Sequence, residues 1–165
     1  MLPRRWFVVS LVFGCLGLVA EDGWAIDRMW IGGSDFWNIN NNWAPTGQPQ
    51  PADNALVDGS PEVTDVEIFN ELTNSGSIDI TTGTLQPTGN TNNTGTINVG
   101  DGSAIVSSFN PGNSTTISGS GDVVLKNSDN LPGSNATIVG GSNTAGAVTN
   151  AAGHTIRGEG TITLS

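Results

Sequence analysis

A seven-residue stretch that recurs at intervals near twenty residues constrains the fold more than any other feature of this sequence. It first occurs at residues 74–80 as NSGSIDI and returns at residues 93–99 as NTGTINV, and three looser copies follow. The marker isoleucines of these copies are 19, 20, 21 and 18 residues apart, at Ile78, Ile97, Ile117, Ile138 and Ile156. A period of this length predicts stacked structural repeats, because one such unit cannot bury its apolar face alone. The five marker isoleucines are then expected to lie above one another on one side of the stack.

Each repeat is predicted to hold two or three short strands separated by glycine corners. Apolar and polar residues alternate, so that Ile78 and Ile80 share one face of a strand and Asp79 lies on the other. A second apolar group, such as that at Leu85, precedes the next marker, and glycines between the groups allow sharp corners. We therefore predict a right-handed parallel β-helix over residues 63–165, with about five coils that each advance ~4.8 Å.

The composition supports this all-β prediction. Charged residues are 12% of the 165 residues, about half of the usual ~25%, and a helical chain would need more Leu, Glu, Lys and Arg. Disorder is the alternative, because 23 residues are glycine and the net charge is −10. The regular spacing of Ile and Val favours a folded repeat, since a solvated linker has no reason to keep a fixed interval.

The charge balance argues against several classes of partner and cofactor. Fifteen acidic residues face five basic ones, and beyond residue 25 the basic side chains are Arg28, Lys126 and Arg157. Nucleic-acid binding needs clustered Lys and Arg, so it is not expected, and a polyanionic polysaccharide would be repelled. The sequence has neither a Cys/His cluster nor an Asp-x-Asp-x-Asp-Gly loop, so no metal or other cofactor is predicted.

Residues 1–25 are predicted to be a signal peptide. A basic start at Arg4 and Arg5 is followed by an apolar run over residues 6–20 and by small residues before a cleavage point after Ala25. The run of about 15 residues is shorter than the ~20 that span a bilayer, so we expect cleavage and export rather than a membrane span in the mature chain. General secretion and twin-arginine export are both open. The one cysteine, Cys15, would leave with the leader.

Residues 26–62 form a segment rich in tryptophan and proline. Three of the five tryptophans lie within fourteen residues, and four prolines follow. Proline is unsuited to helix interiors and central strands, so residues 44–52 are predicted to be an irregular loop and residues 55–57 to start a strand. The motifs in their order are Trp30-x-Gly-Gly, Trp37, Asn42-Trp43 and Pro-x-x-x-Asp53-Asn-Ala-x-Val-Asp58.

These motifs, behind an export leader and before the repeats, resemble the amino-terminal module of bacterial surface β-helix proteins of the autotransporter-passenger and cell-wall-sorted kind. The resemblance implies a parallel β-helix displayed at the cell surface or released from it, with residues 26–62 as its amino-terminal cap. No carboxy-terminal sorting signal or membrane β-barrel is recognised, and the sequence stops at Thr161–Ser165 within an expected strand. A truncated or partial family member is therefore expected.

The three clustered tryptophans have two interpretations. The open end of a stack of repeats exposes apolar core and unpaired backbone, and large aromatic side chains can cover both. Aromatic faces can also stack on sugars, which would make Trp30, Trp37 and Trp43 a carbohydrate platform. The cap is the preferred interpretation. At the other end, strands rich in Thr, Ile and Val predict end-to-end self-association.

The repeats contain two polar features, a recurring asparagine and a single histidine. Asn74, Asn93 and Asn113 each stand four residues before a marker isoleucine, so they predict a ladder of stacked amides, unless asparagine merely suits corner geometry there. His154, the only histidine, occupies the corner position held by Gly76 and Gly95 in earlier repeats. A structural role is expected for it, since a lone histidine lacks catalytic partners.

The expected function is structural or adhesive, at the bacterial cell surface or outside the cell, without catalysis and with no catalytic residue assigned. The alternative is a carbohydrate-binding or polysaccharide-degrading β-helix module that uses the tryptophans or one face of the stack. Degradation requires either grouped carboxylates on one face for acid and base chemistry, or calcium-binding acids beside a basic residue that abstracts a proton. The acids Asp79, Asp101, Asp122 and Glu159 do not recur at one repeat position, so we predict that they do not line a cleft.

Overall fold

The computed structural model describes residues 25–101, 106–112, 115–127, 135–140 and 147–164. The predicted leader, apart from Ala25, lies outside these residues. The described chain is all-β, with a single turn of 3-10 helix, η1 (Asn40–Asn42), between β2 and β3. None of its helical segments has the length and apolarity needed to cross a bilayer.

The strands form three sheets, which we call A, B and C. Sheet A has the order β16-β13-β10-β7-β4-β1-β3 and contains β1 (Asp27–Trp30), β3 (Trp43–Ala44), β4 (Asn54–Val57), β7 (Leu72–Asn74), β10 (Thr91–Asn93), β13 (Thr116–Ser118) and β16 (Thr149–Asn150). Sheet B has the order β17-β14-β11-β8-β5-β2 and contains β2 (Ser34–Phe36), β5 (Ser60–Val63), β8 (Ser77–Ile80), β11 (Thr96–Val99), β14 (Asp122–Lys126) and β17 (Thr155–Glu159). Sheet C has the order β18-β15-β12-β9-β6 and contains β6 (Val66–Phe69), β9 (Thr84–Pro87), β12 (Val106–Phe109), β15 (Asn135–Gly140) and β18 (Thr161–Leu164).

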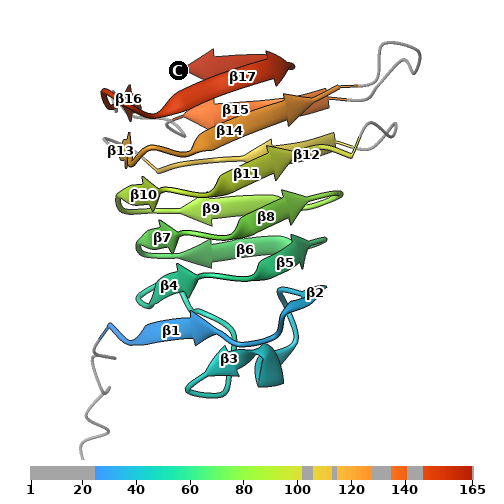
Figure 1. Ribbon diagram of the computed structural model, residues 1–165, viewed down its shortest axis with the longest axis vertical. Coiled ribbons are helices and arrows are strands. Elements are labelled where there is room, and N and C mark those ends of the chain that lie inside the picture. The colour runs from blue at the N-terminus through green and yellow to red at the C-terminus, as the bar shows by residue number, and fades with distance from the viewer. Residues whose placement is uncertain (1–24, 102–105, 113–114, 128–134, 141–146, 165) are drawn as a thin grey trace, which may run out of the picture.

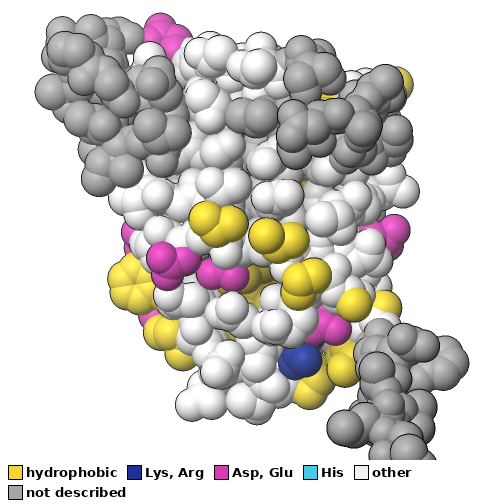
Figure 2. Space-filling view, turned by 180° about the vertical axis from the view of Figure 1, so that it is seen from behind, with side chains coloured by type: hydrophobic (Ala, Val, Ile, Leu, Met, Phe, Trp, Pro, Cys, Tyr) yellow, Lys and Arg dark blue, Asp and Glu magenta, His cyan; other side chains and the backbone are white. Residues whose placement is uncertain are grey.

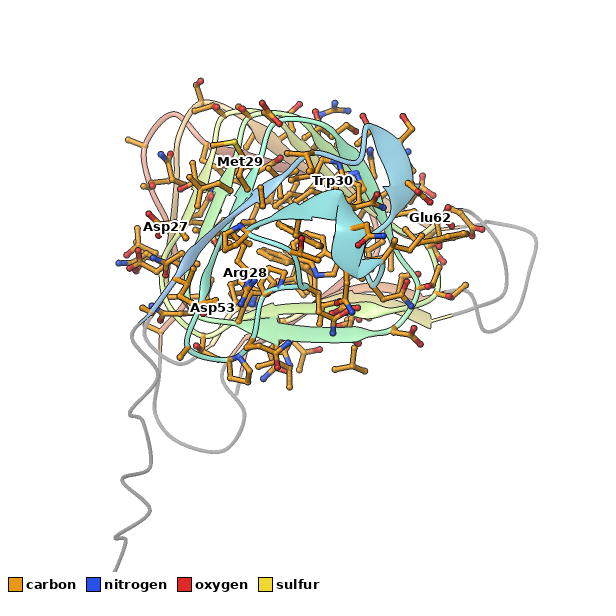
Figure 3. The ribbon with its side chains drawn as sticks, turned by 90° about the horizontal axis from the view of Figure 1, so that it is seen from below. Asp27, Arg28, Met29, Trp30, Asp53 and Glu62 are labelled. Carbon is orange, nitrogen blue, oxygen red and sulfur yellow. The ribbon has the colours of Figure 1, made fainter. Side chains whose placement is uncertain are left out.

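From β4 onward the chain visits the three sheets in turn, so hydrogen-bonded neighbours are three strands apart in the sequence. We call each set of three consecutive strands, one from each sheet, a circuit. Successive circuits lie one above the other (Figure 1). Every strand pair is parallel except β1 and β3, which pair antiparallel at the lower end. Viewed from below, the sheets enclose an interior filled by side chains (Figure 3).

The period near twenty residues describes only part of this stacking. Ile78 and Ile97 are direct partners in sheet B, but the column continues through Val123 to Ile156, so its intervals grow from 19 to 26 and then 33 residues. The other two markers lie elsewhere, as Ile117 belongs to sheet A and Ile138 to sheet C. The prediction that the five marker isoleucines form one stack is therefore wrong. The cause is that longer connections after β11, β12, β14 and β15 shift the sequence positions of the repeats, while the strands keep their register.

The predicted alternation within strands is confirmed. In β8, Ile78 and Ile80 are fully buried while Ser77 and Asp79 are half-buried. Because partners are in register, like positions form columns that cross the circuits. The interior columns are Ala55–Leu72–Thr91–Ile117 in sheet A, Val63–Ile80–Val99–Leu125 in sheet B, and Glu67–Leu85–Phe109–Ile138–Ile162 in sheet C.

A column of glycines forms the corner between sheets A and B. A β-carbon added to Gly95 would lie 2.0 Å from the carbonyl oxygen of Gly76, and one added to Gly76 would lie 2.0 Å from that of Gly59. Real β-carbons do not approach an oxygen so closely. The backbones of successive circuits therefore touch at this corner, and only residues without a side chain allow that contact.

We expect Gly95→Ala to lower the free energy of unfolding by about 2 kcal/mol or more, because the added methyl group collides with rigid backbone on the circuit below. Chemical denaturation monitored by circular dichroism measures this. Gly89→Ala is the matched control, since its β-carbon would be 3.0 Å from side-chain atoms of Asn70 and Glu71, which can move, and no closer than 3.1 Å to backbone, at the carbonyl oxygen of Asn70. Equal losses for both variants would contradict the explanation.

Candidate functional site

The tryptophan cluster is part of the core. Trp30, Trp37 and Trp43 are 2%, 1% and 1% exposed. Trp43 meets the other two rings edge-on, with centroids 5.2 and 4.7 Å apart, and Trp37 stacks on Phe69 at 5.4 Å. Since a sugar needs an accessible ring face, the interpretation of these three residues as a carbohydrate platform is wrong.

An ion pair fixes the loop that follows the tryptophans. The Nε of Arg28 donates to Asp53 Oδ2 at 2.6 Å, and its Nη1 donates to the carbonyl oxygens of Pro45 and Gly47 at 3.1 Å each. Burial raises the pKa of Asp53, but the hydrogen bonds from Arg28 and from the amides of Gln50 and Ile26 outweigh burial and leave this pKa below its ordinary value. Figure 3 shows Arg28 and Asp53 side by side at the lower end.

This ion pair is a contact that the sequence reasoning missed, because Arg28 and Asp53 are 25 residues apart and no repeat links them. The loop predicted over residues 44–52 is confirmed for residues 45–52, but Ala44 belongs to β3, and β4 begins at Asn54, one residue before the predicted strand. The segment 26–62 does more than cover an end, since β1, β2 and β4 are themselves members of sheets A and B.

A hollow lies on the outer side of sheet B. It is a groove of about 500 Å³ that runs across the carboxyl ends of successive strands. Phe36, Glu62 and Asp79 are register partners in series, from β2 to β5 to β8. The groove is lined by Ser34, Asp35, Phe36, Ser60, Glu62, Asp79, Thr81, Gly100, Asp101 and Lys126.

The prediction that the acids line no cleft is therefore wrong for Asp79 and Asp101. They share the groove with Asp35 and Glu62, whereas Asp122 and Glu159 are not among its lining residues. The prediction considered only acids at one repeat position. The groove is instead lined by the ends of strands from several circuits, and the connections between those strands differ in length. The alternating pattern of residues 60–63 and 77–80 does place Glu62 and Asp79 outward, so those two could have been found.

Hydrogen bonds orient the central carboxylates of the groove. Glu62 Oε1 accepts from Thr81 Oγ1 at 2.8 Å, and Asp79 Oδ1 accepts from Asn98 Nδ2 at 2.7 Å. The ring of Phe36 stays 45% exposed. The groove thus offers acceptors for hydroxyl or ammonium groups beside an apolar ring, with Lys126 as the one basic side chain of its lining.

A second carboxyl group is buried away from the groove. Glu67 is 3% exposed and is the partner of Leu85 at the foot of the sheet C column, while its neighbours Val66 and Ile68 point outward, 64% and 38% exposed. Burial, with a smaller contribution from Asp65, raises the pKa of Glu67 from its ordinary 4.5 to about 7. The sequence gives no warning of this, because the alternation of residues 66–69 can be assigned to either face.

The interior also holds hydrogen-bonded amides. Asn74 Nδ2 donates to Asn93 Oδ1 at 2.8 Å, and both side chains are fully buried. This confirms the predicted ladder for its first step, while Asn113 lies outside the described residues. The next partner of Asn93 is His154, with 3.1 Å between Asn93 Nδ2 and His154 Nε2. His154 is 6% exposed, a burial that its corner position did not predict.

Among the described residues, no group of three or more His, Cys, Asp or Glu side chains is arranged to hold a metal ion.

No protein-family model matches the sequence, and no curated protein or solved structure matches it significantly. Functional inference therefore depends on the chain's own geometry.

The buried Glu67 generates a pH-dependent prediction. In the unfolded chain its carboxyl ionises near pH 4.5, whereas in the folded chain it keeps its proton until about pH 7. Stability should therefore fall as pH rises from about 4.5 to 7, by at most about 3 kcal/mol from this group. Glu67→Gln should remove that decline. Denaturation of both proteins at pH 5 and pH 8 measures their free energies of unfolding. If the wild type and Glu67→Gln differ by the same amount at both pH values, the decline does not come from Glu67.

Proposed function

We propose that this chain is a right-handed parallel β-helix with a tryptophan-rich cap, and that it acts as a structural or adhesive protein at the bacterial surface or outside the cell. The observation that carries the proposal is the three-strand step within every sheet from β4 onward. Right-handed connection is the general bias of parallel crossovers, and stacked parallel circuits are an extended architecture that displays side chains on its outer faces.

The outer surface supports a role in contact rather than in chemistry. Polar uncharged side chains point outward along the strands, such as Asn92 in β10 and Thr73 in β7. On the face seen from behind, acidic and apolar side chains are scattered over a surface that is mostly uncharged (Figure 2). Such a surface suits hydrogen bonding to neutral partners.

The upper end supports self-association as part of this role. The described sheets end with β16, β17 and β18, and Ile162 is 51% exposed although its column partner Ile138 is 1% exposed. Backbone groups and apolar core at such an edge favour pairing with further strands, including those of a second copy.

A second candidate function is the binding of a neutral or amine-bearing glycan in the groove. Sugars present hydroxyl edges that donate to carboxylates and C–H faces that stack on rings, and the groove places Phe36 next to Glu62. Its carboxylates would repel polyanionic sugars. If the groove also cleaves the glycan, Glu62 and Asp79 on adjacent strands would be the pair of carboxyl groups, one as the general acid and the other as the base or nucleophile.

Export can be tested first. The protein recovered from the surface or medium of producing bacteria should begin at Ile26, because cleavage after Ala25 removes the leader. Intact-mass spectrometry of the surface, medium and cell-interior fractions measures this. Full-length protein confined to the interior would contradict the proposed location.

Glycan binding can be tested with an oligosaccharide array of neutral, amine-bearing and acidic members. If the groove binds sugar, Phe36→Ala should weaken the strongest neutral or amine-bearing hit at least tenfold, through loss of ring stacking. Ile39→Ala is the matched control, since Ile39 is 37% exposed and does not line the groove. Release of new reducing ends that Glu62→Gln abolishes would establish cleavage and overturn the non-catalytic proposal. Unchanged affinity in Phe36→Ala would remove the groove as the site.

A further inference from the structure

His154 links circuits that are not neighbours. It follows β16, yet its ring reaches Asn93 at the end of β10, and β13 lies between these two strands in sheet A. Ser118 of β13 is the register partner of Asn92, so the next residue, Gly119, lies level with Asn93, between it and the circuit of His154. Gly119 has no side chain. The imidazole therefore crosses one whole circuit, a span of two strand spacings or roughly 10 Å between the backbones.

The surrounding hydrogen bonds assign the protons on this ring. Asn93 Oδ1 accepts from Asn74, and Asn93 Nδ2 donates to the carbonyl oxygen of Asp122 at 3.0 Å, so the amide orientation is fixed. The second hydrogen of Asn93 Nδ2 faces His154 Nε2, which must accept it. His154 Nδ1 then carries the proton and donates to Asn150 Oδ1 at 2.7 Å.

A protonated ring does not fit this arrangement. Imidazolium carries hydrogens on both nitrogens, so its Nε2–H would point at the amino group of Asn93. Turning the Asn93 amide over would break its buried bond to Asn74 and its partly buried bond to the Asp122 carbonyl oxygen. The Asn150 amide cannot turn over to present its Nδ2 to the ring instead, because that nitrogen already donates to the backbone oxygen of His154 at 3.0 Å.

We propose that His154 is an acid-sensitive latch that holds β16 and β17 on the circuits below them. The neutral ring joins Asn93 to Asn150, and protonation replaces one of those bonds with two opposed donors. Acid would then loosen the last circuit while the lower circuits, which do not depend on this ring, stay folded. Loosening would expose the edges of β13, β14 and β15 to new partners.

Few charged side chains lie on the elements around the ring. Asp122 at the start of β14 attracts a proton to His154, but it is paired with Arg157 of β17 through a 2.9 Å contact. Glu159 lies two residues beyond Arg157 on β17, and β10 and β11 carry no ionisable side chain. Burial lowers the pKa of His154, and Asp122 offsets only part of that effect.

The sign of the pH effect follows from linkage. Because the pKa of His154 is lower in the latched state than its ordinary 6.5, the open state takes up the proton first. The latch is therefore complete above pH 6.5 and is lost as the pH falls from 6.5 through the lowered value.

The test combines amide hydrogen exchange with a titration of the single histidine, whose ring signals need no assignment. On lowering the pH from 7.5 to 5, protection factors over residues 149–159 should fall at least tenfold, while those over residues 72–99 should hold. The imidazole should titrate below pH 6.5. His154→Gln stays neutral and should show no such fall in protection.

Three results would overturn the proposal. They are titration of the ring at or above pH 6.5, protection of residues 149–159 that does not change with pH, and the same acid-induced loss in His154→Gln. Should His154→Gln fail to fold, the wild-type titration and exchange data still decide, because the latch requires both a lowered pKa and a loss confined to the last circuit.

Discussion

The structure depends on backbone hydrogen bonds between circuits, made in parallel and in register along three sheets. Each strand is only two to six residues long, too short to be stable alone, and it gains stability because the strands above and below satisfy its amide and carbonyl groups. Side chains then follow the ladder. Once Ile97 is opposite Ile78, the interior column and the outward row of the same strand are both determined. The tryptophan cluster, the glycine corner and the groove all exist because the ladder brings circuits within one strand spacing.

Much of the fold could be predicted from the sequence, because the alternation of polar and apolar residues records which side chains point inward. The strands around Ile78 and Ile97 were predicted on that basis, and the prolines after Ala44 predicted the irregular loop before Asn54. The stacking beyond residue 100 could not be predicted from a constant period. The ladder fixes only strand register, and the connections between strands carry no such constraint, so Ile117 and Ile138 have the expected spacing but lie in other sheets.

The candidate site was harder to predict because it is built from residues on different circuits. Glu62 and Asp79 point outward as their strands require, but Asp101 and Lys126 reach the same groove from strand ends with unrelated sequence. Buried polar residues pose a similar difficulty. Glu67 lies in the same interior column as Leu85 and Phe109 of the next circuits. His154 contacts Asn93, which is 61 residues away in the sequence. Local patterns report which face a residue occupies, but not which distant group meets it.

The uneven length of the circuits has a consequence for how such a chain can change. The interval from Ile97 to Val123 is longer than that from Ile78 to Ile97, yet all three residues stay partners in one column. Extra residues have been accommodated between strands without disturbing the ladder. The connections after β11 and β14 are therefore natural insertion points, where new peptide segments can be grafted onto an unchanged scaffold.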